Sequence, residues 1–123
     1  MNDRFKFRVW NPDGKYYDDE PQYNVCIQID QISGLVLAPF HNNIIEMSTG
    51  LKDKNGNLIY EGDVVYDSVY ENNFAVSWDN DRTGYILSAN NTNHIDYLSK
   101  ILIERHNLKI IGNIHEQAEQ KDK

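Results

Sequence analysis

Short segments in which apolar and polar residues alternate recur along this chain, and turn-forming residues separate them. The clearest is residues 4–10, RFKFRVW, where Phe5, Phe7 and Val9 fall on one face and Arg4, Lys6 and Arg8 on the other. A period of two residues is typical of a strand with one buried face. Further segments of this kind begin near Val25, Leu35, Phe74 and Tyr85. Short strands at this close spacing predict a mainly β fold, a small barrel or roll.

Three turns are predicted from residue type alone. Pro12 presets φ and Gly14 supplies backbone freedom in the segment NPDG, residues 11–14. Asn55-Gly56 is a strong hairpin signal, since both central residues of a two-residue type I′ turn need positive φ. Glu61-Gly62-Asp63 then interrupts two apolar segments, which predicts a tight bend where Gly62 provides the freedom that the backbone needs.

One short helix and one last strand are expected near the C-terminus. Residues 94–105 carry apolar residues at roughly helical spacing, and Asn93 before them is a fair N-cap. Residues 109–114 read as a strand. Residues 15–22 are polar and acidic and read as a loop, and residues 116–123 have no apolar face and are expected to fray.

Composition limits the function classes. The chain has 123 residues, enough for one domain with a real core. It carries 12 basic and 19 acidic residues, a formal net charge of −7, which disfavours general coating of nucleic acid because that needs many phosphate-neutralising cations. Arg4, Lys6 and Arg8 form a basic stripe that fits either a solvated strand face or a local nucleic-acid contact.

The residues with catalytic or metal-binding potential do not form a known motif. Cys26 is the one cysteine, lies in an apolar segment, and is expected to be a buried, inert thiol. The four histidines match no zinc spacing. Residues 79–86 resemble the first eight positions of a calcium loop, but Asn90 stands where the bidentate Glu belongs, which favours a plain hairpin. We therefore predict no catalytic residue, no metal and no cofactor.

The N-terminus lacks the long apolar stretch of a secretion signal, and no segment approaches the length of a membrane span. We therefore expect a cytoplasmic protein without membrane contact.

Three blocks of sequence resemble the YopX-like family of bacteriophage and prophage proteins. They are residues 5–10, FKFRVW; residues 49–65, TGLKDKNGNLIYEGDVV; and residues 110–116, IIGNIHE. Residues 76–80, VSWDN, with Gly84 and Tyr85, are similar to the family's connecting pair of strands. Asn11, where the family often has an acidic residue, and His115, where it often has an aromatic one, depart from the pattern.

The resemblance implies an SH3-like β-roll with additional N-terminal strands and one short helix. We expect a single domain over residues 1–123, with the roll at about 47–116 and the N-terminal strands within 1–46. In such a roll the bend at Gly62 would be a diverging turn at a barrel corner.

The resemblance also implies a phage or prophage accessory protein whose biochemical role is not settled. We predict a non-enzymatic binding or adaptor module for an unidentified host or phage protein, with self-association left open. The alternative is a nucleic-acid-associated factor in phage replication or regulation. SH3-like rolls often bind peptides with aromatic residues beside loops, although the same aromatics could be core residues. The candidate binding residues are Trp10, Tyr60, Asp63, Trp78, Asp79 and Tyr85.

Overall fold

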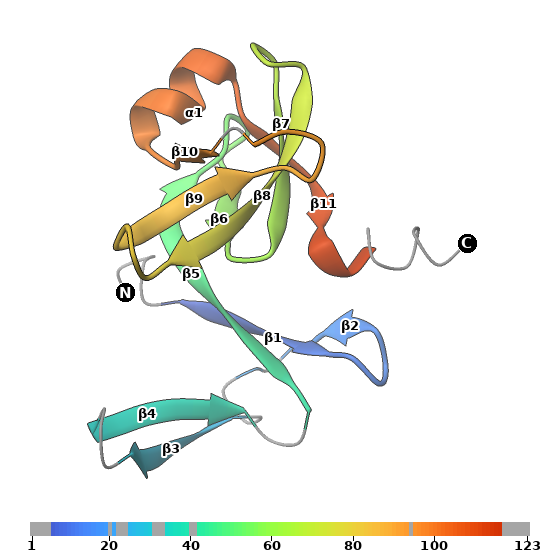
Figure 1. Cartoon of the computed structure of the whole chain (residues 1–123). Coiled ribbons are helices and arrows are strands. Elements are labelled where there is room, and N and C mark those ends of the chain that lie inside the picture. The colour runs from blue at the N-terminus through green and yellow to red at the C-terminus, as the bar shows by residue number, and fades with distance from the viewer. Residues whose placement is uncertain are drawn as a thin grey trace. The chain divides into compact units, whose positions relative to one another are not determined.

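The computed structural model describes residues 6–19, 21, 25–30, 34–39, 42–93 and 95–116. The chain divides into two compact units, one of residues Phe7–Met47 and one of Met1–Lys6 with Ser48–Lys123. The elements of the chain are labelled in Figure 1. No helix in the described part of the chain is long and apolar enough to cross a membrane.

The unit of residues 7–47 is built from antiparallel strands. Strand β1 (Phe7–Asn11) pairs with β2 (Tyr16–Tyr17) and with the first part of β5 (Ile44–Lys52). Strands β3 (Val25–Asp30) and β4 (Gly34–Pro39) pair with each other.

The predicted turn after β1 is confirmed. The Asn11 side-chain oxygen accepts hydrogen bonds from the backbone N–H groups of Asp13 and Gly14, at 3.0 and 3.1 Å. This is an Asx-type turn, in which a short polar side chain satisfies backbone donors that have no strand partner. The turn reverses the chain so sharply that Tyr16–Tyr17, predicted as loop, returns as a two-residue strand beside β1.

The second unit holds a five-stranded antiparallel sheet in the order β10-β9-β8-β7-β11. Its strands are β7 (Asp63–Asp67), β8 (Asn72–Asp79), β9 (Gly84–Ser88), β10 (Ile95–Tyr97) and β11 (Lys109–Asn113). The second part of β5 pairs with β6 (Leu58–Tyr60) in the same unit. The prediction of a mainly β fold, an SH3-like roll with additional N-terminal strands and one short helix, is confirmed.

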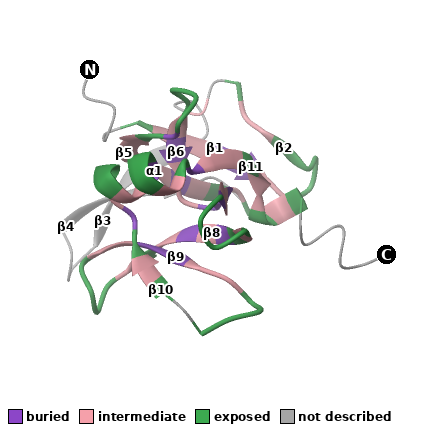
Figure 2. Ribbon diagram, turned by 90° about the horizontal axis from the view of Figure 1, so that it is seen from above, coloured by how far each residue is buried: buried purple, intermediate pink, exposed green. Residues whose placement is uncertain are grey.

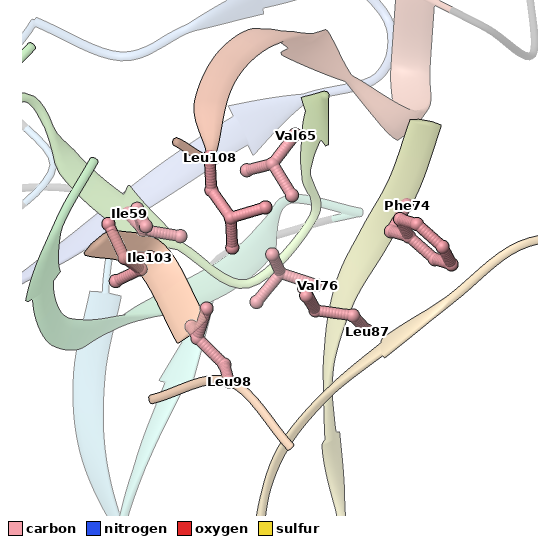
Figure 3. Packing of buried hydrophobic residues seen from close by; sticks show 8 residues of the cluster. All are labelled: Ile59, Val65, Phe74, Val76, Leu87, Leu98, Ile103 and Leu108. Atoms are coloured by element: carbon pink, nitrogen blue, oxygen red, sulfur yellow. The ribbon is translucent and has the colours of Figure 1, made fainter. Parts of the chain in front are cut away.

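The core of this unit lies between the sheet, β6 and helix α1 (Lys100–His106). Alternate residues of the strands point into it, and Ile103 is the buried residue of the helix, whose other face is largely exposed (Figures 2 and 3). The buried cluster consists of Ile59, Val65, Phe74, Val76, Leu87, Leu98, Ile103 and Leu108. Burial of alternate residues is the structural origin of the period-two pattern in the sequence.

The predicted helix over residues 94–105 is wrong in its first half. Residues Ile95–Tyr97 form strand β10, which pairs with β9, and the helix begins only after Ser99. Ser99, rather than Asn93, is the N-cap, and its hydroxyl accepts a hydrogen bond from the N–H of Leu102 at 3.1 Å. The open edge of β9 supplies backbone partners to Ile95–Tyr97, and these long-range hydrogen bonds override the local helical spacing.

The hairpin at Asn55-Gly56 is confirmed, but its predicted two-residue type I′ turn is wrong. The φ angle is positive at Gly56 (85°) and not at Asn55. The loop has three residues, closed by hydrogen bonds from Gly56 N to Asp53 O (3.0 Å) and from Asp53 N to Asn57 O (2.8 Å). The Asp53 carboxylate stabilises this longer loop, because it accepts hydrogen bonds from the N–H groups of Asn55 and Asn57, both at 2.9 Å.

The predicted bend at Gly62 is confirmed. Gly62 has a φ of 86°, in the left-handed region that only glycine adopts at little cost. Its N–H donates to the Val76 carbonyl at 2.9 Å, and its carbonyl accepts from Ile114 N at 2.8 Å. Gly62 therefore ties the bend between β6 and β7 to strand β8 and to the end of β11.

One strand end differs from the prediction, and two predictions fall on parts that the structure does not describe. Strand β11 ends at Asn113, one residue early, because the Asn113 side chain accepts from the N–H groups of His115 and Glu116 and starts a helical turn. The tail beyond Glu116 and the side chain of Cys26 lie outside the described residues.

Candidate functional site

Three of the predicted binding residues lie together at the hairpin between β8 and β9. Trp78 and Tyr85 are directly paired across the two strands, and Asp79 pairs with Gly84 at the start of the turn. The Trp78 and Tyr85 rings meet edge to face, with centroids 5.1 Å apart and planes at 73°. That geometry is favoured by the aromatic quadrupoles and fixes the orientation of both rings.

The exposure of Trp78 follows from its place along β8. Phe74, Val76 and Trp78 are alternate residues and therefore share one face of the strand. Phe74 and Val76 are buried in the core, whereas Trp78, two residues further on, is 45 % exposed. The end of β8 thus extends beyond the core and presents an indole that the sequence pattern assigns to the buried face.

Polar contacts hold both rings in place. The Trp78 Nε1–H donates to the Asn80 side-chain oxygen at 2.6 Å. The Tyr85 hydroxyl donates to the Ser48 backbone carbonyl at 3.3 Å. The indole donor is therefore satisfied within the hairpin, and the ring surface is what this residue offers to another molecule.

Asp79 organises the turn that follows Trp78. One carboxylate oxygen accepts from the N–H groups of Asp81 and Arg82, and the other accepts from the Arg82 guanidinium at 2.6 Å. The Arg82 side chain, through this hydrogen bond above all, holds the pKa of the Asp79 carboxyl below its ordinary value. The contact likewise raises the pKa of Arg82.

These contacts explain the resemblance of residues 79–86 to a calcium loop. Both Asp79 oxygens are used within the hairpin, and β8 and β9 flank the turn where a calcium loop has helices. The hairpin predicted here, with a strand on each side of the turn, is confirmed. Across the described part of the chain, no group of three or more His, Cys, Asp or Glu is placed to hold a metal ion.

Tyr85 provides a test of the electrostatics at this site. Burial, and then the negative charge of Glu61, raise the pKa of the Tyr85 hydroxyl above its ordinary value. We expect Glu61→Gln to lower this pKa part of the way back, because burial remains. The pKa of Tyr85 is higher in the folded state than in the unfolded state, so ionisation of the hydroxyl favours unfolding. The contribution of the protonated hydroxyl to the free energy of unfolding is therefore complete below about pH 10 and is lost as the pH rises further. Carbon-13 NMR of the Tyr85 ring, assigned with Tyr85→Phe, measures the pKa, and an identical value in Glu61→Gln would contradict this role of the Glu61 charge.

The other three candidate residues, Trp10, Tyr60 and Asp63, are not part of the β8–β9 hairpin, and Trp10 and Asp63 are buried. Asp63 is 3 % exposed, and its carboxylate accepts from Tyr60 N at 2.8 Å across the bend at Gly62. Trp10 is 9 % exposed, in the unit of residues 7–47, with its ring edge to face on Tyr17 at 4.9 Å. The hydrogen bond between Tyr60 and Asp63 gives both residues a role in shaping the bend at Gly62.

The predicted basic stripe is partly used within the protein, since Arg8 lies on β1. The Arg8 Nε donates to a Glu46 carboxylate oxygen at 2.8 Å, and the Arg8 guanidinium lies 4.2 Å from the centre of the Tyr17 ring. The Tyr17 hydroxyl donates to the same Glu46 oxygen at 2.8 Å. Lys6 is exposed, and Arg4 lies outside the described residues. Arg8 thus neutralises the charge of the buried Glu46 carboxylate, and Arg8 is therefore less available to bind a phosphate.

One buried pair was not predicted from the sequence. The Asp67 carboxylate contacts Nδ1 of His106 at 2.6 Å, and the two side chains are 1 % and 16 % exposed. The other Asp67 oxygen accepts from the N–H groups of Val69 and Tyr70, at 2.9 Å each. The pair joins the end of β7 to the end of helix α1. The two residues are 39 positions apart, and no local pattern connects them.

Comparisons with known proteins agree with this description. The family model described as "YopX protein" matches residues 6–120. The crystal structure of protein EF1440 from Enterococcus faecalis is similar, with a TM-score of 0.59 and 22 % identity over 94 % of this chain and 96 % of that one. The crystal structure of protein yopX from Bacillus subtilis is also similar, with a TM-score of 0.53 and 18 % identity over 97 % and 98 % of the two chains.

At these identities the two structures establish a shared fold and no more, and no curated protein matches the chain. The family model, in contrast, covers nearly all of the sequence, including the three blocks that carry the resemblance. The chain therefore belongs to the YopX family.

Proposed function

We propose that this protein is a non-enzymatic binding module, an accessory protein of a phage or prophage that recognises a protein partner at the β8–β9 hairpin. The observation that carries the proposal is the 45 % exposure of Trp78, held edge to face on Tyr85. Tryptophan and tyrosine supply much of the binding energy in protein interfaces, since a rigid ring buries a large area at little entropic cost.

The surroundings of the hairpin favour a partner with basic groups. Glu61 lies close enough to Tyr85 for its charge to raise the pKa of that hydroxyl. An exposed indole, paired with a tyrosine that lies within reach of a carboxylate charge, suits a lysine or arginine side chain, which gains from the ring face and from the negative charge. The formal net charge of −7 would draw a basic partner toward the protein as a whole.

The test is a pull-down with tagged protein from prophage-induced host cells, with protein and nucleic acid both identified. We expect a specific protein that is recovered with the parent chain and is reduced at least about tenfold with Trp78→Ala, as for an interface hot spot. Val69→Ala is the matched control, because Val69 is exposed in a turn of the same sheet and lies at the far end of β8.

The outcomes separate the alternatives. Equal recovery of the partner by the parent chain and Trp78→Ala would contradict the hairpin as the binding site, provided that both have the same thermal midpoint. Recovery of nucleic acid that salt releases would contradict a protein-binding role. Recovery of the tagged protein alone would contradict the binding module itself.

A further inference from the structure

A groove lies between helix α1 and the segment that joins β5 to the hairpin loop. It has a volume of about 590 Å³, within the range of sites that hold small molecules. Its walls include Lys52, Lys54, Lys100 and Glu104, and Leu51 and Ile103 supply apolar surface. None of these residues belongs to the β8–β9 hairpin, so the groove is independent of the proposed protein-binding site.

Both walls of the groove are held in place by the fold. Lys100, Ile103 and Glu104 fall on one side of helix α1 because residues three and four apart are neighbours on a helix surface. On the opposite wall, Lys54 N donates to the Leu108 carbonyl at 2.9 Å, which ties the loop to the residues that follow the helix. The Asp53 carboxylate adds a hydrogen bond from Ile110 N at 2.9 Å. Backbone hydrogen bonds therefore hold the loop wall of the groove at a fixed place beside the residues that follow the helix.

The groove is locally basic in an acidic protein. Lys52, Lys54 and Lys100 are all exposed, and in the described part of the chain no hydrogen bond or ion pair engages the side chain of Lys54 or Lys100. Asp53 also lines the groove, but its carboxylate oxygens accept three backbone hydrogen bonds. Glu104 is then the one acidic side chain of the groove that has no such role.

We propose that this groove binds a small phosphorylated organic molecule. Its phosphate group would lie among the lysine ammonium groups, since lysine binds phosphate as a point charge. Its less polar part would lie against Leu51 and the accessible edge of Ile103. The limited volume favours a small molecule over the backbone of a nucleic acid.

The test is an NMR titration of the intact, isotope-labelled chain with adenosine diphosphate as the probe. The NMR signals of the backbone amides of residues 50–54 and 100–104 are expected to shift together as the probe is added and to reach a plateau. Lys100→Gln is expected to weaken binding by about twofold to fivefold, as for one exposed charge pair. Glu104→Gln is expected to strengthen it by about twofold, because a repelling charge is removed. Arg105→Gln, on the same helix and outside the groove, is the matched control and should leave the affinity within about 1.5-fold.

The gain in affinity with Glu104→Gln protects the test against misfolding, because a damaged protein would not bind more tightly. Absence of saturable shifts at millimolar probe, or equal weakening by Lys100→Gln and Arg105→Gln, would overturn the proposal. Adenosine binding as tightly as the diphosphate would overturn the phosphate assignment, and pyrophosphate binding as tightly would overturn the organic part. Tighter binding of single-stranded DNA than of adenosine diphosphate, with shifts of the same amide signals, would show that the groove binds a nucleic acid and would overturn the proposal.

Discussion

Replacing Asp53 with alanine is expected to lower the free energy of unfolding by about 3–5 kcal/mol, because three backbone N–H groups lose their acceptor around a buried site. Asp53 is 5 % exposed. One of its oxygens holds the hairpin loop through Asn55 and Asn57, and the other reaches Ile110 on β11, 57 residues along the chain. The substitution therefore weakens the loop and its link to the last strand together.

Chemical denaturation monitored by circular dichroism measures this effect. Asp53→Asn should be intermediate, because one oxygen still accepts while the amide group faces a backbone donor. The control is Asp81→Ala, which removes an exposed carboxylate from the β8–β9 turn and should change stability by less than about 0.5 kcal/mol. Equal unfolding free energies for Asp53→Ala and Asp81→Ala would show that the buried carboxylate does not stabilise the fold.

The second large effect is expected at Gly62. Gly62→Val should lower the free energy of unfolding by about 2–4 kcal/mol, the sum of left-handed backbone strain and crowding in a buried bend. The φ of 86° is unfavourable for a β-branched side chain, and both backbone hydrogen-bonding groups of Gly62 are engaged, so the bend cannot relax without breaking them.

Gly56→Val is the matched control for this substitution. Gly56 has nearly the same φ, 85°, but a Cβ atom added there would meet no atom within 4 Å. The Gly56→Val variant therefore has the backbone strain without the crowding. Thermal and denaturant unfolding of the two variants should show the larger loss for Gly62→Val. A thermal midpoint for Gly62→Val equal to that of the parent chain would contradict the expectation.

Much of the fold could be predicted because it depends on local patterns. Alternation placed Phe74, Val76 and Leu87 on buried faces, and Gly62 identified the bend by the one property that only glycine has. The helix start could not be predicted in the same way. Ile95 and Leu98 have helical spacing, but Ile95 lies in a strand because β9 offers it a paired edge, and the sequence around Ile95 does not contain that edge.

Only part of the candidate site could be predicted from the sequence. Trp78, Asp79 and Tyr85 were found together because a hairpin brings neighbouring segments into contact. Trp10 and Asp63 were included for their residue types, and only the structure gives their burial. The contribution of Glu61 at Tyr85, and that of Lys100 opposite Lys54 in the groove, depends on segments that meet through space.

The sequence by itself determined the mainly β class, the sites of the hairpins and the family, because strand periodicity, turn chemistry and motif similarity are all properties of short segments. The tertiary structure alone decided which carboxylates are buried, which aromatic rings reach solvent and which lysines face one groove. The reason is that Asp53 with Ile110, and Asp67 with His106, are partners across 57 and 39 positions. Such contacts form only when the whole sheet has closed, and no local pattern encodes them.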